Sequence, residues 1–256
     1  MKKIHKILIG VAVFLIFFVY FVFQIAPANK VLKLVPPPKN ISLVGVSGTL
    51  FDGEADSVTV EKYSYENVRW KTSLWGLITK QLTLIIKDPQ GMNGSGNVQF
   101  NSDGSFNFDS VKMKISFANF LKYVKYTLPV KVSGNIDLSL DEAMLSINKC
   151  RKLKGSVDLD GVIVFTPMGE FDLGSSKIDL NCRNGLLIAK MMKADNEYFT
   201  LDGNMEYDLP KRAYVVRAFA KPKDTHKNEV SMLLQMFGKM NPAGTYEIVY
   251  QGQFTY

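Results

Sequence analysis

The chain has 256 residues and a net charge of +7, and its length suffices for one large hydrophobic core or two small ones. Its 31 Lys+Arg exceed its 24 Asp+Glu only modestly, and no basic cluster is interleaved with aromatic residues. This composition argues against nucleic acid as a partner. Two cysteines and two histidines are also too few for a typical metal-ligand cluster.

The N-terminal segment differs from the rest of the chain. Three lysines precede the apolar run Ile7 to Phe23, and no ionisable side chain other than tyrosine follows until Lys30. As a helix extended to Ala26, this run spans roughly 30 Å, the thickness of a bilayer core. Because the lysines lie on the short N-terminal side, we predict a cytoplasmic tail at residues 1–6, a transmembrane signal-anchor at residues 7–26 and an exported remainder.

A cleaved signal peptide is the alternative, because Ala26-Pro27-Ala28 resembles an A-x-A cleavage site. The apolar run is longer than the usual apolar region of such a peptide, and a proline inside the site is unfavourable. We therefore favour an uncleaved anchor.

Beyond the anchor, residues 27–40 are predicted to form a proline-rich linker, because Pro36-Pro37-Pro38 favours an extended spacer. In residues 41–256 the dominant hydrophobic period is two, as in Val111, Met113 and Ile115, which is typical of half-buried strands. A second alternating set comprises Val157, Leu159, Ile163 and Phe165. Turn signals recur about every 10 to 15 residues, and no long helical pattern separates the strands. The residues predict an all-β extracytoplasmic domain built as an antiparallel meander.

The stretch after the linker is rich in glycine. Its spacing lacks the Lys-Ser/Thr of a phosphate-binding loop, and no strong helix follows. Asp52-Gly53 is instead a strong hairpin signal, because both residue types tolerate positive φ. We therefore predict a tight turn at Asp52-Gly53, a positive φ at Gly53, and inward packing of Leu50 and Phe51.

Two short segments have helical spacing. One is Phe117 to Val124, which Ser116 would cap, and the other is Glu229 to Gly238. Trp70 and Trp75 allow two interpretations: a stacking platform for carbohydrate or lipid, or packing in the core or at the membrane-proximal edge. We favour the second.

Cys150 and Cys182 both lie in the predicted exported part, where such a pair most often forms a disulfide. The bridge would close a loop of 33 residues, counted from 150 to 182, and would stabilise the fold by roughly 3–4 kcal/mol on the chain-entropy model. Acidic residues are scattered singly, and His226 lies in a polar run predicted to be an exposed loop. No catalytic, metal-binding or cofactor-binding residue is predicted.

Several local patterns, taken in order, resemble the family of type II secretion system protein N (general secretion pathway protein N). A membrane anchor precedes the motif Gly48-Thr49-Leu50-Phe51-Asp52-Gly53, in which the family usually has Trp in place of the phenylalanine. Trp70 and Trp75 follow in Val-Arg-Trp and Leu-Trp-Gly-Leu contexts. Cys150 and Cys182 stand in contexts similar to the family's C…G and L-x-C-x-x-G. The resemblance spans nearly the whole chain.

This resemblance implies an accessory subunit that crosses the inner membrane once, with its C-terminal domain in the periplasm. It implies contacts with other type II secretion subunits, no catalysis and no cofactor. The family is also similar to AsmA-like and TamB-like envelope proteins, which implies a long, curved, half-open antiparallel sheet with an apolar groove.

A lipid-binding or lipid-transfer module is the alternative function, in which the inner face of a curved sheet would hold acyl chains. The residues expected to line such a groove are Phe106, Phe108, Phe117, Phe165, Phe199 and Phe219. An ordinary core would use the same residues, so aromatic content leaves both functions open.

Overall fold

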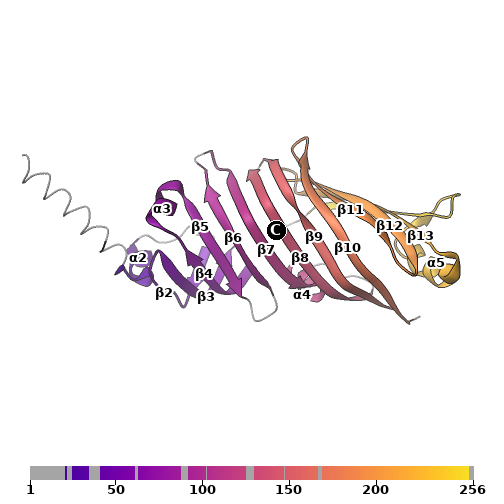
Figure 1. Ribbon diagram of the computed structural model, residues 1–256, viewed down its shortest axis with the longest axis horizontal. Helices are drawn as coiled ribbons and strands as arrows, with labels where there is room; N and C mark the ends of the chain where they lie inside the picture. The colour runs from indigo at the N-terminus through magenta and orange to yellow at the C-terminus, as the bar shows by residue number, and fades with distance from the viewer. Residues whose placement is uncertain are drawn as a thin grey trace, which may run out of the picture. The chain divides into compact units, whose positions relative to one another are not determined.

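The fold is taken from a computed structural model (Figure 1). The structure describes residues 21, 25–34, 41–60, 63–87, 92–101, 103–124, 130–146, 148–166 and 169–253. Within these ranges no helix is long and apolar enough to cross a membrane. The predicted anchor lies outside them except for Phe21, Ile25 and Ala26, and so it stays a prediction.

The chain divides into two compact units, Met1–Pro89 and Gln90–Tyr256. The first unit contains a small antiparallel sheet in the order β1-β3-β4-β5, with β2 also pairing with β3. Its elements are α2 (Ala28–Leu34), β1 (Ile41–Val44), β2 (Ser47–Gly48), β3 (Asp52–Val60), β4 (Tyr63–Lys71), α3 (Leu74–Thr79) and β5 (Gln81–Lys87). Part of the predicted linker is therefore the helix α2.

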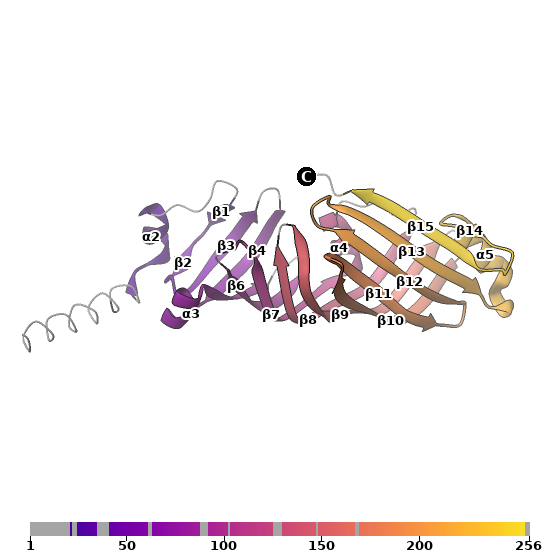
Figure 2. The same ribbon diagram turned by 90° about the horizontal axis from the view of Figure 1, so that it is seen from above.

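The second unit is an antiparallel meander in which almost every strand pairs with the next one along the chain (Figures 1 and 2). At its end β15 pairs with β13, and β14 pairs with the outer side of β15. The strands are β6 (Asn93–Phe100), β7 (Phe106–Ser116), β8 (Lys131–Ser146), β9 (Lys149–Thr166), β10 (Gly169–Arg183), β11 (Leu186–Asp195), β12 (Phe199–Asp208), β13 (Ala213–Pro222), β14 (Lys239–Met240) and β15 (Tyr246–Gln253). The prediction of an all-β antiparallel fold is confirmed, whereas the AsmA-like shape stays a prediction.

One face of this second sheet is apolar, and we call it the apolar face. Paired residues form continuous rows across the strands. One row is Met113, Leu138, Val157, Ile178, Met191, Gly203, Ala218 and Ile248, and the next on the same face is Val111, Leu140, Gly155, Leu180, Ala189, Met205, Val216 and Tyr250. The row between them points to the opposite, polar face and consists of Lys112, Ser139, Ser156, Asp179, Lys190, Asn204, Arg217 and Val249. Because side chains alternate along a strand, the register fixes both faces at once.

β-Bulges keep the apolar face in phase. Between Leu159 and Val162 the register of β9 against β8 shifts at Gly161, which has a φ of 56°. Leu159 and Val162 therefore face the same side, and Phe165 faces the polar side, where Lys131 lies 5.4 Å from its ring centroid. The prediction that Ile163 and Phe165 share a face with Leu159 is wrong, because strict alternation does not survive the extra residue.

Within the part of the chain that the structure describes, three buried clusters lie at the ends of strands of the second unit. One packs α5 (Lys227–Gln235) through Val230 and Leu233 against Phe199 and Tyr246, and Figure 2 shows α5 beside β14. The second joins Val132, Val162 and Val164 to Phe117 at the start of α4 (Phe117–Val124). The third contains Ala143, Leu153 and Cys150, and Cys150 forms the predicted disulfide with Cys182. Core formation thus concentrates where a helix or the disulfide covers the apolar face.

Both predicted helices are present. α4 has the predicted bounds, and the Ser116 hydroxyl accepts a hydrogen bond of 3.3 Å from the Asn119 N–H, as a cap does. α5 begins two residues before the predicted Glu229 and follows the short 3₁₀ helix η1 (Asp224–His226). The polar run around His226 is therefore helical, which corrects the predicted exposed loop.

The turn between β6 and β7 is tied to β9 by a polar cluster. The buried Ser105 hydroxyl donates a 2.6 Å hydrogen bond to Asp103, and Arg151 binds the other carboxylate oxygen at 2.7 Å. The Ser105 hydroxyl and then the Arg151 guanidinium hold the pKa of Asp103 well below its ordinary value. The ionised carboxylate is the form that the folded protein prefers.

The Asp103→Asn substitution should lower the free energy of unfolding near neutral pH. A depressed carboxyl pKa contributes stability above about pH 4, the ordinary aspartate value, and that contribution is lost as the pH falls through the lowered pKa. The difference between variant and wild type should therefore shrink steadily below about pH 4 in urea unfolding of the full chain in mild detergent. Asp158→Asn, an exposed aspartate of β9, is the control; an equal pH dependence in both variants would contradict the assignment.

Candidate functional site

The structure gives no metal-binding cluster within the described ranges. No group of three or more His, Cys, Asp or Glu side chains there is placed to hold a metal ion. His226 contacts the ring of Tyr198 at 5.1 Å between centroids and lies 3.5 Å from carboxylate oxygens of Glu197 and Glu229. The absence of catalysis stays a prediction, and the remaining candidates are surfaces for contact with other molecules.

The glycine-rich motif forms a turn, although not at the predicted residues. The Thr49 N–H donates a 2.8 Å hydrogen bond to the Asp52 carbonyl, and the Thr49 hydroxyl accepts from the N–H groups of Phe51 and Asp52 at 3.2 and 3.1 Å. The turn therefore spans Thr49–Asp52, and Phe51 is 7% exposed, in line with inward packing. The strong Asp-Gly hairpin signal is overridden by this hydroxyl-stabilised turn, which lies two positions earlier.

Gly53 lies in β3 and does not have the predicted positive φ, which Gly48 has instead at 76°. Gly48 and Gly53 are paired across β2 and β3, and Trp70 of β4 pairs with Gly53 from the other side. A Cβ on Gly53 would overlap the Trp70 ring and lie 2.6 Å from the Thr49 carbonyl oxygen. Glycine is required here because the indole covers the backbone, and the Trp70 N–H donates a 3.2 Å hydrogen bond to the Leu50 carbonyl.

The same turn holds two other segments of the first unit. Pro27 forms an isolated antiparallel bridge with Thr49, and Ala28 beside it is completely buried. On the other side the Thr72 N–H donates a 2.7 Å hydrogen bond to the Phe51 carbonyl, immediately before α3. We call the residues 48–53 together with Trp70 the junction motif, since they join the chain after the predicted anchor to α3.

Trp75 does not join the junction motif. Its side chain is 73% exposed in α3, so the core-packing interpretation fails for this residue, while Trp70 is packed.

Sequence reasoning missed the docking of Pro27, because a single bridge leaves no periodic signal.

The six phenylalanines expected to line a groove do not share a face. Phe106, Phe108 and Phe199 point to the apolar face, and Phe117 packs at its end. Phe106 and Phe108 stack at 6.4 Å between centroids, while Phe199 is buried against α5. Phe165 and Phe219 lie on the polar face because the strand register places them there.

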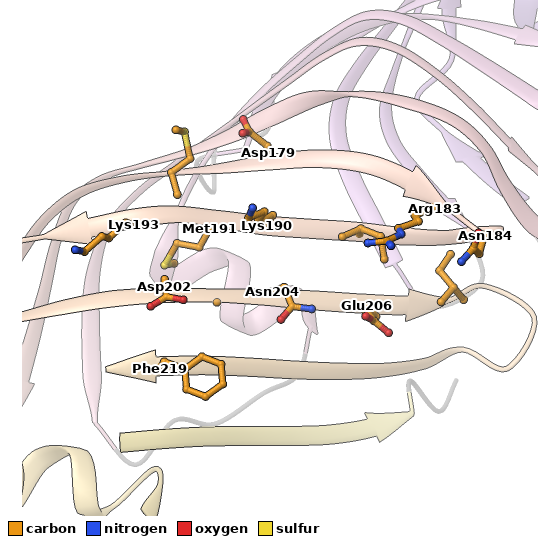
Figure 3. Close-up of a pocket in the computed structure, with 14 residues that line it drawn as sticks. Asp179, Arg183, Asn184, Lys190, Met191, Lys193, Asp202, Asn204, Glu206 and Phe219 are labelled. Carbon is orange, nitrogen blue, oxygen red and sulfur yellow. The ribbon is translucent and has the colours of Figure 1, made fainter. Parts of the chain in front are cut away.

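A hollow of about 1100 Å³ lies on the polar face over β10 to β13 (Figure 3). Three acidic and three basic side chains line it: Asp179, Asp202, Glu206, Arg183, Lys190 and Lys193. Met192 and Phe219 add exposed apolar surface, at 54% and 36%. The balanced charges favour neither an anionic nor a cationic ligand.

The last strand of the second sheet has an open edge. β15 pairs with β13 along its whole length, but β14 covers its other side only opposite Tyr246 and Glu247. From Val249 to Gln253 that side has no strand partner among the described residues. This segment contains no charged residue and no proline, the usual protections of an edge strand. We call Val249–Gln253 the open edge.

Comparison with known proteins identifies the family. Residues 39–249 match the family described as type II secretion system (T2SS), protein N. The chain belongs to this family. Relatives named type II secretion system protein N are 28% identical in Aeromonas hydrophila (97% of this chain, 99% of the relative), 24% in Pectobacterium carotovorum subsp. carotovorum (99% of each) and 23% in Vibrio cholerae serotype O1 (89% and 90%). No solved structure matches the chain.

In this member of the protein N family, Gly53→Ala should destabilise the first unit. The added methyl would clash with the Thr49 carbonyl and the Trp70 ring, and overpacking of this kind costs about 1–3 kcal/mol. Gly94→Ala is the control, since its methyl would meet its nearest neighbour at 3.3 Å. Thermal unfolding followed by circular dichroism should show a lower melting temperature for Gly53→Ala alone. Equal shifts would refute the close packing described here.

Proposed function

We propose that this protein is an accessory component of a type II secretion system, anchored in the inner membrane by residues 7–26, with its β-domain in the periplasm. It acts by protein contacts without catalysis. Near full-length similarity to proteins named type II secretion system protein N supports the pathway. The lysines before Ile7 and the apolar run after them support the anchor and its orientation.

The open edge of β15 is the observation that carries the proposed mode of action. Alternate residues of an edge strand point their N–H and C=O groups outward, where an extended segment of another protein adds as a further strand. At this edge Val249 is 49% exposed on the polar face of the sheet, and Tyr250 is 39% exposed on the apolar face. An added strand with apolar residues at alternating positions would cover both side chains.

The first unit has a sheet edge of its own at β1 and β2, and this edge is protected. There β1 has four residues and β2 has two, and Gly45 with a φ of 67° separates them. Short, interrupted strands are poor templates for strand addition. The contrast between the two edges favours β15 as the docking strand, and membership of the protein N family supports a secretion subunit as its partner.

A photo-cross-linking amino acid at Val249 should capture a type II secretion subunit in cells that carry the apparatus. Met192, an exposed residue of the inner strand β11, is the matched control position and should capture none. Val249→Lys should reduce export of a secreted reporter, whereas Met192→Lys should not, because a charge at an edge opposes strand addition. Cross-linking only to a second copy, or normal export by Val249→Lys, would overturn the docking mode.

A lipid-binding module is the second candidate, and one observation favours it. The two apolar rows defined above contain no fully buried residue, whereas the clusters at the strand ends are buried. Among the described residues no second layer covers the middle of the apolar face. An acyl chain would cover it in the same way as a helix.

Lipid binding predicts phospholipid that stays with the full chain through purification in mild detergent. Ile178→Glu places a charge in the middle of the apolar face and should remove that lipid, because burying an unpaired charge is unfavourable. Lys177→Glu, one residue earlier on the polar face, is the control and should retain it. Native mass spectrometry gives the readout, and wild-type protein without lipid would exclude this candidate.

A further inference from the structure

Among the described residues, Trp75 is the most exposed large apolar side chain, at 73%. It lies in α3, whose sequence Leu-Trp-Gly-Leu-Ile-Thr has no charged residue. A tryptophan side chain offers a large apolar area with one polar N–H, a combination that is enriched where membranes meet water. We therefore expect another molecule to cover this side chain.

The position of α3 is fixed from both ends. The Thr72 N–H binds the Phe51 carbonyl, and the Thr72 hydroxyl donates a 2.8 Å hydrogen bond to the Gln81 carbonyl. The Ser73 hydroxyl accepts from the Gly76 N–H at 2.9 Å, at the start of the helix. α3 is therefore held against the junction motif, with Trp75 three residues beyond Thr72.

The chain that leaves the predicted anchor reaches the same turn. The anchor is predicted to end at Ala26, and Pro27 bridges to Thr49, in the turn whose Phe51 carbonyl holds Thr72. Ile25 and Phe21 are 71% and 57% exposed, as lipid-facing residues at the end of a span would be. A helix of six residues is about 9 Å long, so all of α3 stays close to the end that Thr72 holds at this turn.

Most of the charged residues beside the helices α2 and α3 are basic, with Asp52 opposite Lys71 across β3 and β4 as the acidic exception. Lys71 and Lys80 flank α3, and Lys30 and Lys33 lie on α2; all four are exposed. Neither helix contains an acidic residue. Basic residues beside an apolar helix are attracted to the anionic lipids of a bilayer surface.

We propose that α3 is a second membrane contact, in which Trp75 inserts into the headgroup region of the bilayer beside the anchor. The occupant of this exposed helix is the phospholipid surface. The inference rests on the membrane anchoring proposed above and adds a second point of attachment to it. With two attachment points the first unit has a defined face toward the membrane.

Tryptophan fluorescence of the full chain in vesicles of phosphatidylethanolamine and phosphatidylglycerol tests this contact. The chain has two tryptophans, so the difference between wild type and Trp75→Phe isolates the emission of Trp75. Lipids brominated near the top of the acyl chain should quench that emission roughly twofold, as expected for an interfacial tryptophan. The emission of Trp70, which remains in Trp75→Phe, should not be quenched by the brominated lipids.

Other outcomes overturn the proposal. Quenching of Trp75 by iodide to the same extent in vesicles and in detergent would show that it faces water. Protection from both iodide and brominated lipid would show that protein covers it. Extraction of the protein from the vesicles by alkaline carbonate would instead contradict the anchor, which separates the two failures.

Discussion

The second sheet depends on one constraint: its apolar side chains must stay on the same side of every strand. The paired rows from Met113 to Ile248 and from Val111 to Tyr250 satisfy it across β7 to β15. A one-residue slip would move a whole row to the polar side. Bulges such as the one at Gly161 absorb extra residues, so long strands bend without losing that phase.

The first unit is organised around a different requirement, the close approach of Trp70 to backbone. Gly53 leaves room for the indole, Gly48 leaves room for the backbone of Asp52 and Gly53, and the Thr49 hydroxyl completes the turn between them. Pro27 and Thr72 then dock on the same few peptide groups. A motif that first suggests ligand binding thus places three segments of the chain, and its glycines serve packing.

Much of the fold is readable from the sequence because period-two hydrophobicity and turn residues are local. α4 was predictable to the residue, since Ser116 and four apolar positions lie within nine residues. The reason for a glycine at position 53 was not predictable, because it is the close approach of Trp70 on the next strand and not a positive φ. The opposite facing of Phe165 depends on a bulge, which alternation alone does not show.

The interaction surfaces were harder to predict for the same reason. The open edge exists because β14 begins only at Lys239, shortly after α5, so no strand residue lies opposite Val249 and beyond, and this is a property of strand order and length. Exposure of Trp75 likewise follows from how α3 is held, while its residue type and context gave no sign of it. Sequence patterns indicate which residues belong inside a sheet, and tertiary pairing decides which are left at its margins.

The disulfide has a topological consequence. Cys150 and Cys182 lie at the end of the β9–β10 hairpin that is far from its turn, so the bond closes the hairpin into a covalent ring. A protease cut between Thr166 and Gly169 would leave both strands in one molecule. Tension between the two strands at that end would be carried by a covalent bond and would not unzip their hydrogen bonds one by one. The disulfide therefore joins two neighbouring strands in the middle of the second unit's sheet by a covalent bond.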